Sequence, residues 1–193
     1  MESQVICLVR HGEIDTGGKK RYIGHTDLPL SENGRAQAAR LRDELSCIPF
    51  SGVFCSDLDR SVSTAITICE KQCQKPFIMK GLREIDMGLW EGLAFEEVRR
   101  LYPGEFERRG ADIINYRPPG GESFAQCAAR VMSAFDEILA SASGSVLIVG
   151  HKGVNRIIIS RAKGIPLADM FKIPQDYGYL NILMSTEDGW QVV

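Results

Sequence analysis

The sequence lacks an excess of charge of either sign, because 23 lysine and arginine residues face 25 aspartate and glutamate residues and leave a net charge of −2. Unspecific binding to nucleic acid or to a membrane surface needs a strong basic excess, so we expect neither partner. No apolar run comes near the roughly 18 residues of a membrane span. No basic residues precede the apolar stretch between Met1 and Val9, so we expect no secretory leader and a cytoplasmic protein.

Paired cysteine motifs are absent as well. The six cysteines form no Cys-x-x-Cys pair, and no histidine lies at metal-ligand spacing from two of them. We therefore expect no metal site, no disulfide framework and no cofactor. Cys7 and Cys55 lie in short apolar runs, where cysteine behaves as a small buried hydrophobic residue, and the cysteines are interpreted as structural.

A chain of 193 residues with 44% hydrophobic and 25% charged residues is typical of one globular domain. The expected strands are Gln4–Arg10, Gly52–Ser56, Pro76–Lys80, Ser145–Val149, Tyr179–Met184 and Trp190–Val193, the last two forming a hairpin that turns at Asp188-Gly189. The expected helices begin at Ser31, at Asp57 or Asp59, at Phe95, at Glu122 and at His151, and they end near Ser46, Lys71, Leu101, Ser141 and Gly164. This alternation predicts an α/β domain of three layers with a mostly parallel sheet.

The stretch from Gly81 to Gly121 differs in composition from the rest of the chain. It is rich in glycine, proline and charged residues, and it ends in Pro118-Pro119-Gly120-Gly121. We interpret it as an insertion over one edge of the sheet. The chain is thus predicted to be a single domain, residues 1–193, with an insertion at about 81–121 that covers the active site.

Two of the three histidines, His11 and His151, directly follow apolar runs of strand length. Ligands of such sheets bind beyond the carboxyl ends of the strands, where these residues stand. A neutral imidazole can attack phosphorus and become a phosphohistidine, and a second histidine can donate to a phosphoryl oxygen. The guanidinium groups of Arg10 and Arg60 match phosphate oxygens. A carboxyl group such as that of Glu84 can protonate a leaving oxygen and then accept a proton from water, and this arrangement needs no metal.

Each of these residues also has an ordinary structural interpretation. A histidine at a strand end is often a loop residue, and loop arginines often form surface ion pairs. Glu84 has rivals in Glu13 and Glu91, since most loop glutamates are solvated. The run Lys19-Lys20-Arg21 either attracts an anionic substrate or forms a solvated face. His25 follows no strand and is interpreted as a residue of the loop or of the pocket wall.

Six segments carry a resemblance to a known family: LVRHGE (Leu8–Glu13), TDLPLSENG (Thr26–Gly34), CSDLDRSVSTA (Cys55–Ala65), LREIDMGLWEG (Leu82–Gly92), PPGGES (Pro118–Ser123) and VGHKGVNR (Val149–Arg156). In this order they resemble the histidine phosphatase superfamily, also called the phosphoglycerate mutase-like family. The resemblance implies a mixed six-stranded sheet with helices on both sides. It implies that His11 is the phosphorylated nucleophile and that Glu84 is the proton donor and then the base. It also places Arg10, Arg60 and His151 on the phosphate.

The loop after the nucleophilic histidine departs from the family at two positions. Many members carry Asn where this sequence has Gly17, and Thr or Gln where it has Ile23, directly before Gly24. These side chains normally donate hydrogen bonds near the phosphate. The backbone N–H groups of Gly17 or Gly18, or the hydroxyl of Thr16, are the expected replacements, so the 15–25 loop is expected to bind phosphate through its backbone.

Within the superfamily, the segments GHTDLPLSENG and YRPPGGES most resemble α-ribazole phosphatases of the cobalamin pathway. The expected function is therefore hydrolysis of a small-molecule phosphomonoester, with α-ribazole 5′-phosphate as a candidate. A phosphomutase is the first alternative, although the sequence ends directly after its last predicted strand, without the tail that would close a mutase site. A non-catalytic relative that binds phosphorylated ligands is the second. The segment Gly12–Lys19 fits the P-loop template poorly, because its lysine comes one residue late.

Overall fold

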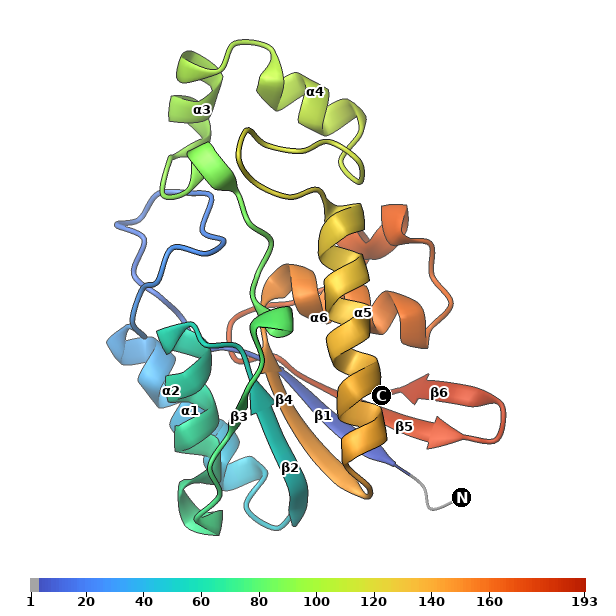
Figure 1. Ribbon diagram of the computed structural model, residues 1–193. Coiled ribbons are helices and arrows are strands. Elements are labelled where there is room, and N and C mark those ends of the chain that lie inside the picture. The colour runs from blue at the N-terminus through green and yellow to red at the C-terminus, as the bar shows by residue number, and fades with distance from the viewer. Residues whose placement is uncertain (1–3) are drawn as a thin grey trace.

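A mixed six-stranded sheet forms the centre of the protein (Figure 1). The computed structural model describes residues 4–193; residues 1–3, which begin the segment considered for a leader, lie outside the described part. The strands stand in the order β3-β2-β4-β1-β5-β6, and β1 pairs in parallel with β4 but antiparallel with β5. Their bounds are β1 Val5–Arg10, β2 Phe50–Cys55, β3 Phe77–Ile78, β4 Ser145–Gly150, β5 Leu180–Thr186 and β6 Gly189–Val192.

Helices cover both faces of this sheet. Helices α1 and α2 share one apolar cluster with the strands, and α5 and α6 share a second cluster on the opposite face. The helices are α1 Glu32–Glu44, α2 Asp59–Cys69, α3 Phe95–Leu101, α4 Glu105–Ala111, α5 Phe124–Ser141 and α6 Lys152–Ala162, with 3₁₀ turns η1 Glu70–Gln72, η2 Lys80–Leu82, η3 Gly88–Trp90 and η4 Leu167–Lys172. This arrangement confirms the predicted three-layer α/β fold with a mixed sheet. Within residues 4–193, no helix combines the length and apolar character that crossing a membrane requires.

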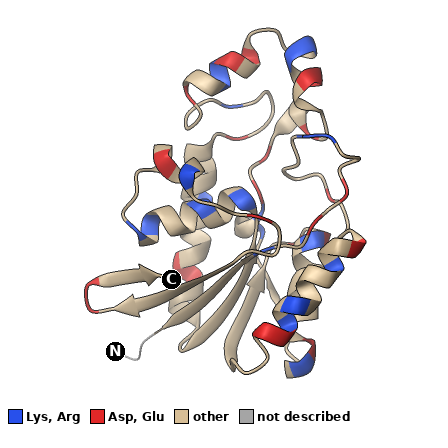
Figure 2. Cartoon of the chain, turned by 180° about the vertical axis from the view of Figure 1, so that it is seen from behind, with Lys and Arg blue, Asp and Glu red and all other residues tan. Residues whose placement is uncertain are grey.

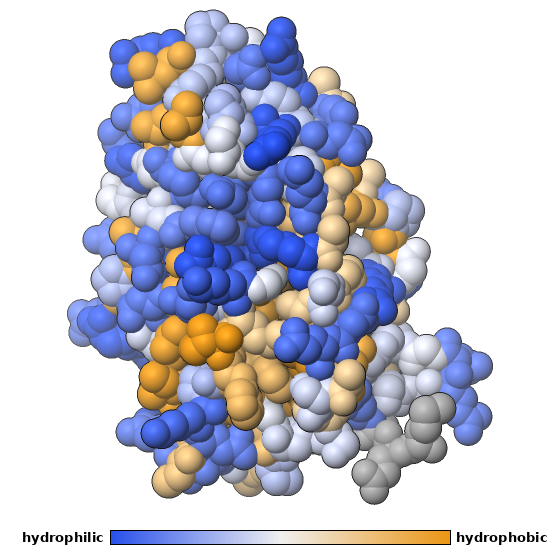
Figure 3. All heavy atoms as spheres, viewed as in Figure 1, coloured by the Kyte–Doolittle hydropathy of each residue, from blue (hydrophilic) through white to orange (hydrophobic). Residues whose placement is uncertain are grey.

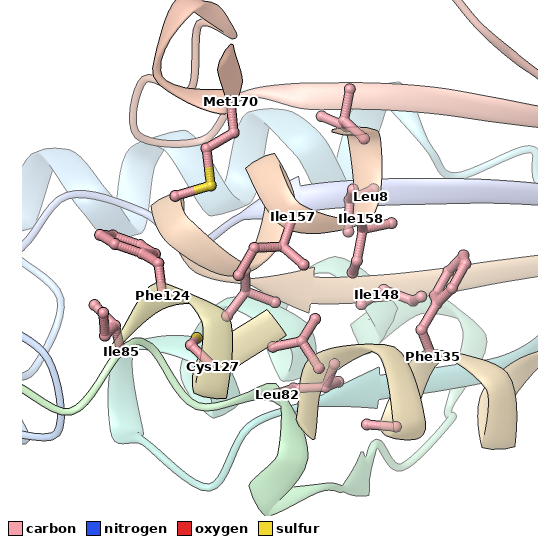
Figure 4. Packing of buried hydrophobic residues seen from close by; sticks show 14 of the residues in the cluster. Leu8, Leu82, Ile85, Phe124, Cys127, Phe135, Ile148, Ile157, Ile158 and Met170 are labelled. Atoms are coloured by element: carbon pink, nitrogen blue, oxygen red, sulfur yellow. The ribbon is translucent and has the colours of Figure 1, made fainter. Parts of the chain in front are cut away.

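The two apolar clusters explain why the interior positions of β1 and β4 are all apolar. In β1, Leu8 belongs to the cluster on the α5–α6 face, while Cys7 and Val9 belong to the cluster on the α1–α2 face. Successive side chains of a strand point to opposite faces, so a strand covered on both sides is apolar throughout. Figure 4 shows the α5–α6 side of the core, where Leu8 and Ile148 of the sheet face α5 residues such as Phe135.

Tertiary contacts shift some helix boundaries from the predicted positions. Ser31 caps α1 with its side chain, as predicted. Helix α2 instead begins after Leu58 and has no side-chain cap, so the prediction of Asp57 or Asp59 as its cap was wrong. The carboxylate of Asp57 is engaged elsewhere, because it accepts two hydrogen bonds from Arg83, at 2.6 and 2.5 Å.

The outer strands are also shorter or shifted. Only Phe77 and Ile78 of the expected strand Pro76–Lys80 pair with β2. They lie at the edge of the sheet and are exposed, and apolar surface gathers on this part of the molecule in Figure 3. The hairpin turns one residue earlier than predicted, since Thr186 pairs with Gly189.

The segment 81–121 lies against the loop that follows β1, residues 11–30. Tyr22 of this loop donates its backbone N–H to the carbonyl of Leu93 at 3.0 Å, and its ring lies 5.2 Å from that of the buried Trp90. In Figure 1, the loop and helices α3 and α4 lie together beyond the carboxyl ends of the parallel strands. Helix α4 was not predicted. The two segments therefore form walls above the strand ends.

The described cysteines take no part in these walls. All six are free, and Cys7 and Cys55 are buried as predicted. Burial raises the pKa of the Cys7 thiol to about 11 and that of Cys55 to about 12, so both stay protonated and behave as core residues.

Candidate active site

The two strand-end histidines lie side by side because their strands are neighbours. Strands β1 and β4 pair in parallel with Arg10 opposite Gly150, so the next residues, His11 and His151, meet at the edge of the sheet. Their ring centroids are 5.0 Å apart, and the two residues are 3% and 0% exposed. The pairing register of the sheet thus builds the centre of the site.

The surroundings of His11 determine its protonation. Burial first, and the charges of Arg10 and Arg60 second, lower its pKa well below the ordinary value of 6.5, so the imidazole is neutral at pH 7. The Nδ1 atom lies 2.7 Å from the carbonyl oxygen of Gly12, which can only accept, so Nδ1 carries the proton. The Nε2 atom therefore keeps a free lone pair, in a residue that lines a pocket of about 590 Å³.

The hydrogen bond with Ser56 makes His151 a hydrogen-bond donor at Nδ1, whereas His11 has a free lone pair at Nε2. The Ser56 hydroxyl lies 2.8 Å from His151 Nε2 and accepts the N–H of Leu58 at 3.3 Å. Since its proton has no other acceptor among residues 4–193, the hydroxyl donates to Nε2, and Nδ1 carries the ring proton. This buried Nδ1 has no hydrogen-bond partner in the described part of the chain. A buried donor without a partner is costly, so an acceptor bound beside it would be stabilised.

Arg10 is held beside His11 by neutral groups. Its guanidinium donates to the carbonyl of Gln175 at 2.7 Å, and its Cζ lies 3.7 Å from the centroid of the Tyr177 ring. Its buried Nε has no partner in residues 4–193. These neutral contacts fix the guanidinium and leave its charge available to an anion.

Arg60 is positioned through the backbone of residues 24–26. It donates to the carbonyls of Gly24 and Thr26 at 2.7 and 2.8 Å. The carboxylate of Glu91 accepts the N–H groups of Gly24, His25 and Thr26 at 2.7–3.1 Å and the Thr26 hydroxyl at 2.6 Å. One rival for the acid role therefore orders the backbone that holds Arg60 and does not line the pocket.

Glu84 is the predicted carboxylate that does line the pocket. Its oxygens accept the N–H of Gly153, in the first turn of α6, at 3.0 and 3.1 Å. Its backbone carbonyl accepts from Arg130 of α5 at 2.9 Å, so both ends of the residue are fixed. The other rival, Glu13, accepts from the side chains of Ser31 and Asn33, outside this pocket.

The structure brings most of the predicted site residues to one pocket. These are Arg10, His11, Thr16, Ile23, Arg60 and Glu84, while His151 is fully buried beside His11 and is not among the lining residues. Gly17 and Gly24 are not among the lining residues, and their N–H groups donate to Asp15 at 2.8 Å and to Glu91 at 3.1 Å. Phosphate binding by the backbone of the 15–25 loop stays a prediction. Within residues 4–193, no three His, Cys, Asp or Glu side chains are arranged to hold a metal ion.

The pocket also contains residues that the sequence analysis missed. They are Ile14, Phe95, Lys152, Asp176 and Tyr177. Strand β5 runs antiparallel to β1, so the residues before it, Asp176 and Tyr177, reach the edge where β1 ends. These two residues could have been predicted only if the sequence had shown that β5 lies next to β1. Lys152 directly follows His151 and could have been found by the argument that selected the histidine.

We predict that the two buried histidines make stability fall below neutral pH. Burial lowers the pKa of both His11 and His151 well below 6.5, so the unfolded chain binds protons that the folded protein does not. The free energy of unfolding should fall as the pH drops through 6.5, by at most about 1.4 kcal/mol per pH unit for each histidine. Urea unfolding at pH 7.5, 6.0 and 5.0 measures this slope. An equal slope in the His11→Asn/His151→Asn double variant would contradict the prediction.

Comparisons with known proteins identify the family of this chain. The model of the histidine phosphatase superfamily (branch 1) matches residues 6–193. The adenosylcobalamin/alpha-ribazole phosphatase of Salmonella typhimurium is 31% identical over 174 residues, which cover 90% of this chain and 86% of that protein. The 6-phosphofructo-2-kinase/fructose-2,6-bisphosphatase of Caenorhabditis elegans is 33% identical over 171 residues, 86% of this chain. The matched part is 35% of that relative, so the chain spans about a third of its length.

A solved structure extends the likeness to the whole fold. The alpha-ribazole phosphatase from Shigella flexneri superposes with a TM-score of 0.90 at 26% sequence identity, covering 98% of this chain and 94% of that one. Together these matches confirm the resemblance carried by the sequence motifs.

Proposed function

The chain belongs to the histidine phosphatase superfamily, and on this premise we propose that it hydrolyses a small-molecule phosphomonoester through a phosphohistidine on His11. The observation that carries the proposal is the neutral imidazole of His11, whose free Nε2 belongs to a pocket-lining residue flanked by Arg10 and Arg60. A lone pair and two fixed cations are what attack on a phosphoryl group requires.

The first step transfers the phosphoryl group to the protein. His11 Nε2 attacks phosphorus in line with the ester bond, so the Nε2–P bond forms while the bond from phosphorus to the alcohol oxygen breaks. Arg10, Arg60 and the Nδ1–H of His151 stabilise the charge on the phosphoryl oxygens. Glu84 gives its proton to the departing alcohol oxygen.

The second step returns the protein to its starting state. Glu84, now a carboxylate, accepts a proton from water as the water oxygen attacks phosphorus. The Nε2–P bond breaks, inorganic phosphate leaves, and His11 recovers its lone pair. Glu84 ends protonated, as the first step needs it.

The alcohol part of the substrate is a separate question. The phosphatases among the relatives carry names of different substrates, so membership in the superfamily leaves the choice open. α-Ribazole 5′-phosphate is our named candidate, since the loop segments resemble α-ribazole phosphatases, and with it a place in the cobalamin pathway. We also propose that the protein is cytoplasmic. We further propose that it is a single domain whose segment 81–121 covers the active site.

Phosphate release from a panel of esters tests the proposal. The panel contains α-ribazole 5′-phosphate, 3-phosphoglycerate, phosphoserine and a sugar phosphate, each in excess EDTA. We expect metal-independent release from at least one ester, and a His11→Ala control that releases none. Loss of release in EDTA would contradict the metal-free mechanism. Transfer of phosphate between two phosphoglycerates without net release would instead identify a mutase, and tight binding without either would identify a binding protein.

A further inference from the structure

The pocket carries more positive charge than one phosphoryl group needs. Two acidic residues, Glu84 and Asp176, belong to the lining. Six basic residues belong to it as well: Arg10, Lys19, Lys20, Arg21, Arg60 and Lys152. A volume of about 590 Å³ also exceeds the size of a phosphoryl group, so part of the pocket is left for the alcohol.

The arginines of this set are already engaged. Arg10 and Arg60 donate to backbone carbonyls and flank His11. Arg21 donates to the carbonyls of Thr16 and Gly92 at 3.2 and 2.8 Å, so it joins the two walls of the pocket. The three lysines differ, since none of their ammonium groups has a hydrogen bond or ion pair within residues 4–193. These are Lys19, Lys20 and Lys152.

The surroundings of the Lys152 ammonium group are themselves positively charged. Lys152 is the first residue of α6, where the helix dipole is positive. Partial burial first, and the charges of Arg10 and Arg156 second, lower the pKa of this largely exposed side chain, while Asp176 and Glu84 act in the opposite direction without forming an ion pair with it. A bound anion would relieve this unfavourable field.

Lys19 and Lys20 approach the same pocket from another wall. They belong to the loop after β1, whose basic run lies next to α3 in Figure 2. Apolar surface for a carbon skeleton comes from Ile14, Ile23, Phe95 and Tyr177. Cations from two walls and an apolar surface thus share one pocket with the nucleophile.

We propose that the alcohol part of the substrate carries a second anionic group, a carboxylate or a second phosphate, which binds Lys152 together with Lys19 and Lys20. This inference rests on the proposed phosphatase function. It ranks esters with a second anion above α-ribazole 5′-phosphate, which has none.

Matched pairs of esters test the proposal. 3-Phosphoglycerate and glycerol 3-phosphate differ in a carboxylate against a hydroxymethyl group, and fructose 1,6-bisphosphate and fructose 6-phosphate differ in a phosphate. In at least one pair, we expect kcat/KM to be about tenfold or more higher for the ester that carries the second anionic group. This is the range of one charge-assisted contact. The pair that shows the preference identifies the group as carboxylate or phosphate.

Variants of one helix provide the controls. Lys152→Met should reduce this preference by about tenfold, while Lys152→Arg should retain it. Lys163→Met, at the far end of α6, should retain it too. Turnover of both members with a ratio near one, or an unchanged ratio in Lys152→Met, would overturn the inference and leave the phosphatase function standing. If no ester is turned over, calorimetric binding of the same four esters to wild type and Lys152→Met decides the inference separately.

Discussion

The His11→Ala variant is expected to release phosphate at least about 10⁴-fold more slowly than the wild type, because it removes the atom that forms the bond to phosphorus. The flanking Arg10 and Arg60 would still bind phosphate, since neither depends on His11 for its hydrogen bonds. Binding of inorganic phosphate should therefore survive while turnover is lost. Rapid quenching with ³²P-labelled ester should show an acid-labile phosphoprotein in the wild type and none in the variant.

His25→Ala is the matched control for this loss. It changes the third histidine of the chain, which lies on the loop beside Arg60 but does not line the pocket. We expect it to keep the labelled phosphoprotein and a rate within about tenfold of wild type. Substantial turnover in His11→Ala, with normal folding by circular dichroism, would falsify covalent catalysis by His11.

The Glu84→Gln variant is expected to discriminate between leaving groups. Alkyl phosphates need a proton on the departing oxygen, so their hydrolysis should slow by about 10²- to 10⁴-fold. Nitrophenyl phosphate leaves as a stable anion and should slow far less. The amide keeps the size of the carboxyl group, and the fixed backbone of Glu84 should hold it in place. The two esters are compared by the rate constant of phosphoryl transfer to His11, measured in single-turnover experiments.

Glu13→Gln serves as the control, because Glu13 is a glutamate of the neighbouring loop that lies outside the pocket. It should affect both esters alike and only slightly. Equal slowing of alkyl and nitrophenyl esters in Glu84→Gln would show that Glu84 does not act as the acid.

Sequence patterns predicted the parts of the fold that depend on local periodicity. Strand β4 was found because its apolar run is continuous, and α1 because Ser31 offers a cap. The cap of α2 was mispredicted because Asp57 forms a distant pair with Arg83, a contact that local sequence does not reveal. Strand β3 was overestimated because its apolar residues lie on an exposed edge.

The residues of the active site were also only partly predictable from the sequence. His11 and His151 could be predicted because each directly follows an apolar strand. The family resemblance already indicated Glu84, but residue types alone left Glu91 as a rival. Only three-dimensional contacts show that Glu91 binds the amides of residues 24–26. Tyr177 could not be predicted, because its position depends on where β5 enters the sheet.

The unequal anchoring of the pocket lining has a consequence for natural variation. Arg10 and Arg60 are tied to carbonyls at the centre of the fold, so a change at either position disturbs several neighbours. The ammonium groups of Lys152, Lys19 and Lys20 line the same pocket but have no hydrogen bond or ion pair with any residue that the structure describes. Substitutions at these lysines should therefore change the free energy of unfolding little, and natural variants can carry them. Descendants of this chain can acquire new substrates while inheriting the bond-breaking groups intact.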